Sequence, residues 1–112
     1  MDSHNEPTEW EVSFAGIAEA QLRDIFVAAG PRGTMPEFVQ MYAEIDRRLR
    51  TDPETFGEPR RYHPELNLHQ RMGGIRLLMF RYGVHRESRR VFVQQVIELV
   101  GRDAAEGGNG SN

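Results

Sequence analysis

The segment from Leu66 to Val100 constrains the fold more than any other part of the chain. It contains three runs, LNLHQRMGG, IRLLMFRYGV and VFVQQVIELV, rich in the aliphatic, aromatic and β-branched residues that favour strands. The pair Gly73-Gly74 has the backbone freedom for a tight turn, and the polar stretch HRESRR separates the second run from the third. The last run is dense in valine and has no breaker, which is typical of a central strand. We therefore expect three consecutive strands.

A short strand is predicted near the start of the chain. Trp10, Val12 and Phe14 alternate with polar residues, the pattern of a strand with one buried face. Acidic residues decorate its other face, so we expect it at an edge of the sheet.

Two amphipathic helices are predicted next. Apolar residues recur at helical spacing over 15–29, and Gly30-Pro31 is expected to end that helix. Thr34 and Glu37 have the spacing of a capping box, which predicts the start of a second helix. That helix is expected to stop before Pro53. The short connection makes the two helices antiparallel neighbours.

The order of these elements predicts an α+β fold. An antiparallel two-helix hairpin should pack on one face of a four-stranded, mainly antiparallel sheet in the order β-α-α-β-β-β. The proline- and charge-rich stretch 51–64 is expected to be an irregular connector, pinned to the body by Phe56 and Tyr62. Residues 10–101 should form a single domain, while 1–9 and the glycine- and acid-rich tail 102–112 are expected to be disordered. The uncovered face of the sheet is where we expect function.

Composition excludes several classes of protein. The chain has no cysteine, so disulfides and thiolate chemistry are excluded. No apolar run reaches the roughly 20 residues of a membrane span, and the polar, acidic N-terminus is unlike a secretory signal. We therefore expect a cytoplasmic protein without a membrane contact. No glycine-rich phosphate loop is present, and the histidines lack standard ligand spacing, so neither a cofactor nor a metal is expected.

All 14 basic residues are arginine, and they are unevenly placed. Residues 46–102 hold 12 arginines against 7 acidic residues, whereas residues 1–45 hold 2 against 8. Two interpretations of this surplus stay open. The arginines contact phosphate or an acidic partner, or they solvate a sheet face and pair with local acids.

The chain resembles the RelE/ParE superfamily of bacterial type II toxins over about residues 10–100. The resemblance rests on WEVSF leading into a helix, on a second helix ending in RRLRTDP, and on GGIRLLMFRYGV followed by RRVFVQQV. In particular, Gly74-Ile75-Arg76 is similar to the opening of the family's third strand, and Val91-Phe92-Val93 to its valine-rich fourth strand. The resemblance implies a toxin module with an antitoxin partner, acting on ribosome-bound mRNA as an endoribonuclease.

The resemblance also implies which residues would act. Arg76 matches the third-strand arginine and is expected on the open face as a phosphate clamp, and His69 falls on a second-strand position, where it would act as the base. The expected nucleic-acid contacts are Arg71, Arg61, Arg47 and Arg48.

The catalytic set is incomplete by the same comparison. Asn67 stands where the family has a basic residue, and Ile97-Glu98-Leu99 stands where it has a small basic motif. Weak or absent cleavage is therefore expected. The alternatives are a non-catalytic protein-binding module and an inactive remnant of the same fold. Aromatic residues of the strands, Phe80, Tyr82 and Phe92, could stack bases but are better explained as core.

Overall fold

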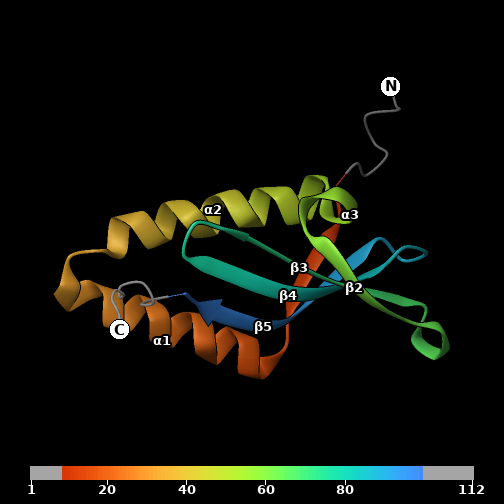
Figure 1. Cartoon of the computed structure of the whole chain (residues 1–112), viewed down its shortest axis with the longest axis horizontal. Coiled ribbons are helices and arrows are strands. Elements are labelled where there is room, and N and C mark those ends of the chain that lie inside the picture. The colour runs from red at the N-terminus through yellow and green to blue at the C-terminus, as the bar shows by residue number, and fades with distance from the viewer. Residues whose placement is uncertain (1–8, 100–112) are drawn as a thin grey trace, which may run out of the picture.

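The computed structural model describes residues 9–99 and is built around a five-stranded sheet in the order β1-β5-β4-β3-β2 (Figure 1). The elements are β1 (Glu11–Phe14), α1 (Gly16–Arg32), α2 (Met35–Thr51), α3 (Pro53–Phe56), β2 (Glu58–His63), a 3-10 turn (Pro64–Leu66), β3 (Leu68–Ile75), β4 (Leu78–His85) and β5 (Arg90–Glu98). The α+β class is confirmed. The expected disorder of 1–8 and 102–112 falls outside the described residues.

The three predicted C-terminal strands form the centre of the sheet. β3 pairs with β4 and β4 with β5, both antiparallel, with Val84 opposite Val91. The polar stretch after β4 forms the predicted hairpin loop. β1 is an edge strand, as predicted, and it pairs with β5 in parallel, so that Val12 also lies opposite Val91.

The two long helices cover one face of this sheet. Figure 1 shows α1 and α2 running antiparallel to each other, joined at one end of the molecule. The fully buried side chains they supply include Ala18, Ala29, Ile45 and Leu49, and those of the strands include Leu78, Phe80, Tyr82, Val84, Val91 and Val93. Phe80 and Tyr82 are therefore core residues, as predicted, whereas Phe92 is half-buried.

The boundary between the helices differs in detail from the prediction. α1 continues past Pro31, whose fixed φ suits a helix, and ends at Gly33 in the left-handed conformation with φ 74°. Thr34 is the N-cap of α2 as expected, but the capping box does not form, because its side chain makes no cap hydrogen bond. Its hydroxyl instead donates to the carbonyl of Ala29 at 3.5 Å.

The prediction that 51–64 is an irregular connector was wrong, because this stretch contains α3 and a fifth strand, β2. β2 has the sequence EPRRYH and a mostly exposed burial pattern, so it lacks the apolar alternation by which strands are predicted. Its pairing with β3 defines it, with a bulge between Pro59 and Arg61. An edge position tolerates both the proline and the charge.

The prediction of a turn at Gly73-Gly74 was also wrong. Both glycines lie inside β3, and the turn to β4 is formed by Arg76 and Leu77. The glycines serve close packing instead, since a Cβ on Gly73 would lie 2.8 Å from the ring of Phe56. Phe56 is partly buried against the core, so its predicted pinning role is confirmed.

Candidate functional site

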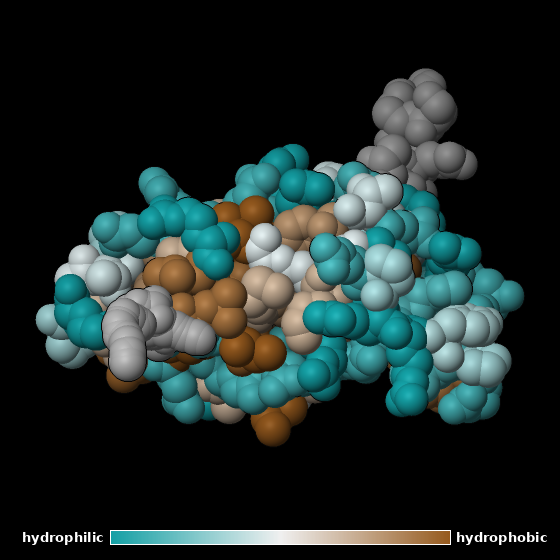
Figure 2. Space-filling view, in the orientation of Figure 1, coloured by the Kyte–Doolittle hydropathy of each residue, from teal (hydrophilic) through white to brown (hydrophobic). Residues whose placement is uncertain are grey.

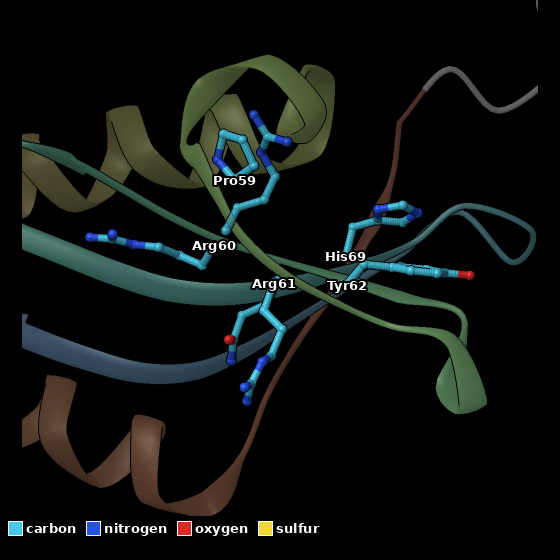
Figure 3. Close-up of a pocket in the computed structure, with 7 residues that line it drawn as sticks. Pro59, Arg60, Arg61, Tyr62 and His69 are labelled. Carbon is cyan, nitrogen blue, oxygen red and sulfur yellow. The ribbon is translucent and has the colours of Figure 1, made fainter.

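An open pocket of about 250 Å³ lies at the β2–β3 hairpin, which extends beyond the ends of the helices (Figures 1 and 3). We call it the hairpin pocket. Its lining residues are Pro59, Arg60, Arg61, Tyr62, His69, Gln70 and Arg71. The antiparallel register builds it, because Tyr62 lies opposite His69 and Arg61 opposite Gln70. The bulge at Arg60 adds a second arginine of β2 to the pocket, beside Arg61, and Arg71 of β3 is the third.

The pocket brings together three of the six residues predicted from the sequence. Arg61, His69 and Arg71 all line it. In Figure 3 the side chain of His69 lies on one side of the β2 ribbon and that of Arg61 on the other. The predicted residues therefore lie on both sides of the edge strand, in contrast to the predicted single strip on the open face.

Arg76 does not join them, and its predicted position was wrong. It is exposed in the β3–β4 turn, with a left-handed φ of 55°, and does not lie on the open face of a strand. From His69 to Ile75 the extended strand covers roughly 20 Å. One phosphate cannot contact both side chains across that distance.

The two predicted arginines of α2 are engaged elsewhere. Arg47 forms an ion pair with Glu44 one turn before it on the helix. Arg48 lies over the ring of Phe56, 4.9 Å from its centroid. Neither lines the hairpin pocket.

The arginines of the hairpin pocket lack carboxylate partners in the described part of the chain. Other arginines are paired, as in Arg32 with Glu98 at 3.0 Å and Arg50 with Asp46 at 3.1 Å. Within residues 9–99 no ion pair is made by Arg60, Arg61 or Arg71. Uncompensated guanidinium groups gathered at one surface attract anions.

Arg71 is the most constrained of the three. Its Nη2 donates to the carbonyl of Gly57, and its buried Nε has no hydrogen-bond partner. The N–H of Gly57 donates to the hydroxyl of Tyr82 at 2.9 Å, and that hydroxyl donates to the carbonyl of Pro53 at 2.7 Å. Burial raises the pKa of Tyr82, so the phenol stays neutral and able to donate. The α3–β2 junction and Arg71 are thus fixed from the core.

Tyr62 and His69 form an aromatic stack at the outer end of the pocket. Their ring centroids are 4.3 Å apart with an interplanar angle of 29°. The hydroxyl of Tyr62 donates to the side-chain oxygen of Asn67 at 3.3 Å. Tyr62, predicted to pin the connector to the body, is 47% exposed and contacts the sheet through His69 of β3.

Sequence reasoning missed Arg60, Tyr62 and Gln70 as pocket residues. The signal available was the run Arg60-Arg61-Tyr62, in which basic and aromatic residues are adjacent, a composition common in nucleic-acid contacts. That run was read as connector because β2 was not recognised as a strand.

Within residues 9–99, no cluster of three or more histidine, aspartate and glutamate side chains could hold a metal ion. Over the same stretch, each helix is too short or too polar to cross a membrane.

Comparisons with known proteins add no relative from which a role could be transferred. The sequence matches no protein-family model, and searches among curated proteins and among solved structures likewise found no match.

Proposed function

We propose that this protein is a toxin-like module that binds RNA through the hairpin pocket. The observation that carries the proposal is the group of three arginines, Arg60, Arg61 and Arg71, without an ion pair in residues 9–99. Phosphodiesters are the polyanion that guanidinium groups on a protein surface are best suited to bind. The resemblance to the RelE/ParE toxins supports RNA as the source of those phosphates.

Cleavage is the reaction that the same residues would support. A ribose 2′-hydroxyl attacks its own phosphodiester when a nearby group accepts the proton and cations stabilise the charge on the phosphorane. The P–O5′ bond then breaks, leaving a 2′,3′-cyclic phosphate on one fragment, and the departing 5′-oxygen takes up a proton to become a hydroxyl. His69 is the histidine of the pocket, and Arg71 and Arg61 lie in the same lining. Arg71, two residues along β3 from His69 and on the same face, replaces Arg76 in the clamp role, since Arg76 lies at the far end of β3. Arg61, on the other side of β2, contacts a neighbouring phosphate of the strand.

The binding proposal predicts a steep dependence on salt. For single-stranded RNA the logarithm of the affinity falls with the logarithm of the salt concentration by about 0.7 for each phosphate neutralised. Three arginines therefore predict a slope near −2. Arg61→Ala should make the slope shallower by about 0.7, measured by fluorescence anisotropy with a short unstructured oligonucleotide. Arg23→Ala, which removes an exposed arginine from α1, is the matched control and should leave the slope unchanged.

The cleavage proposal predicts that His69 matters and Arg76 does not. We expect slow cleavage of RNA and none of a fully 2′-deoxy oligonucleotide, because the 2′-hydroxyl is the nucleophile. His69→Gln should slow cleavage by about 10²-fold or more, while Arg76→Ala and His85→Gln should retain it, as followed on a denaturing gel. Cleavage that survives His69→Gln would place the reaction elsewhere on the molecule.

One observation favours the alternative, a protein-binding module. Leu77 and Leu99 are 39% and 40% exposed and joined by a backbone hydrogen bond. Met79 lies opposite Ile97 on the uncovered face of the same sheet end. Figure 2 shows brown surface on this face. An interaction that is independent of salt and lost on Met79→Ser would support a protein partner in place of RNA.

A further inference from the structure

The one exposed aromatic ring in residues 9–99 belongs to Tyr62. Core rings such as Phe80 and Tyr82 are fully buried, and the remaining aromatic side chains are buried or half-buried against the body. An exposed tyrosine contributes little to the core, so packing does not explain it.

One face of the Tyr62 ring is covered and the other is available. The covered face stacks on His69, with 4.3 Å between ring centroids. Tyr62 belongs to β2, the last strand of the sheet, and among residues 9–99 no further strand lies beyond it. In Figure 3 its ring extends from β2 away from the body of the sheet. A flat ligand can therefore continue the stack on the outer face.

The ring is also held in place before any ligand arrives. Its hydroxyl donates to Asn67, which has a left-handed φ of 50° at the end of the hairpin turn. An aromatic side chain fixed at both its ring and its hydroxyl loses little conformational freedom on binding. The stack thus has the properties of a preformed platform.

We infer that the Tyr62–His69 stack is a platform for one unpaired nucleobase, so that the hairpin pocket selects single-stranded over double-stranded RNA. This inference rests on the proposed RNA binding and names its substrate class. Arg60 and Arg61, which immediately precede Tyr62, would contact the phosphates that flank the stacked base. In a duplex both faces of each base are already covered by neighbours, so a duplex gains the arginine contacts alone.

The test uses the full chain with four probes that carry the same number of phosphates. These are an RNA strand that is abasic except for a single 2-aminopurine, the same strand with that position abasic as well, an RNA duplex of half the length, and inorganic polyphosphate. We expect the single strand to bind on the order of 10-fold or more tighter than the other three, with the 2-aminopurine fluorescence quenched by stacking.

Variants of Tyr62 separate the ring from its hydroxyl. Tyr62→Leu should weaken binding of the single strand by about 10- to 100-fold and abolish the quenching, while leaving polyphosphate binding unchanged. Tyr62→Phe keeps the ring and should stay within about threefold of the parent protein. Because Tyr62 is 47% exposed, both variants are expected to fold, which circular dichroism checks.

The experiment distinguishes failure of the stacking platform from failure of the proposed RNA binding. Equal affinity for all four probes, unchanged by Tyr62→Leu, would overturn the platform while leaving the arginine site intact. Absence of salt-dependent binding to any of the probes would overturn the proposed RNA binding and the platform with it.

Discussion

A Gly57→Ala variant should lose roughly 2–4 kcal/mol of its free energy of unfolding, measured by urea denaturation. The added Cβ would lie 2.7 Å from the carbonyl oxygen of Met72 and 2.8 Å from the hydroxyl of Tyr82. The first of these is backbone within β3 and cannot move without disturbing the sheet. The cost is one of space, because Gly57 has φ −100° and ψ 175°, a conformation that alanine adopts readily.

The same substitution at Gly16 is the matched control. Gly16 is the first residue of α1, and a Cβ there meets nothing within 4 Å. Alanine is the better helix former, so Gly16→Ala should be neutral or stabilise the protein by up to about 1 kcal/mol. Equal stability of the two variants would contradict the close packing of Gly57 against Met72 and Tyr82 at the α3–β2 junction.

Leu49→Ala should cost about 2–5 kcal/mol, because it leaves a cavity between α2 and the sheet. The Leu49 side chain is 0% exposed. Val39 lies on the same helix and is 47% exposed, so Val39→Ala should change the free energy of unfolding by at most about 0.5 kcal/mol. A small effect of Leu49→Ala in the same thermal or urea melt would contradict the placement of α2 over the sheet.

The parts of the fold that were predicted correctly are those whose signal is local and periodic. The apolar stripe of α2, from Phe38 to Leu49, predicts both the helix and its buried face. The run that forms β5 is rich in valine and lies inside the sheet as expected. Burial of one face leaves such a pattern in the sequence whatever the partner element is.

The parts that were missed depend on neighbours far away in the sequence. β2 is a strand because β3 offers it an unpaired edge, and its own residues carry no apolar alternation. Gly73 reads locally as a turn residue, yet the ring of Phe56 is what requires it to lack a side chain. Pairing and close approach of this kind cannot be read from local propensity.

The candidate site was predicted in part for the same reason. His69 and Arg71 were found because they lie on a recognisable strand, and Arg76 was misplaced because the turn was predicted three residues too early. Tyr62 and Arg60 were missed along with β2. An error in the position of one turn therefore placed Arg76 on a strand face, when it lies in the turn itself.

The parallel pairing of β1 with β5 has a consequence for how the chain folds. Glu11 lies opposite Arg90, so most of the domain's sequence separates these two paired strands. During synthesis β1 emerges first and has no strand partner until β5 has been synthesised. The α1–α2 hairpin and the β3–β4 hairpin have only local contacts to make and can form earlier. Closure of the sheet by β5 is then the late step, and a chain halted before Arg90 leaves both β1 and β4 with an open edge.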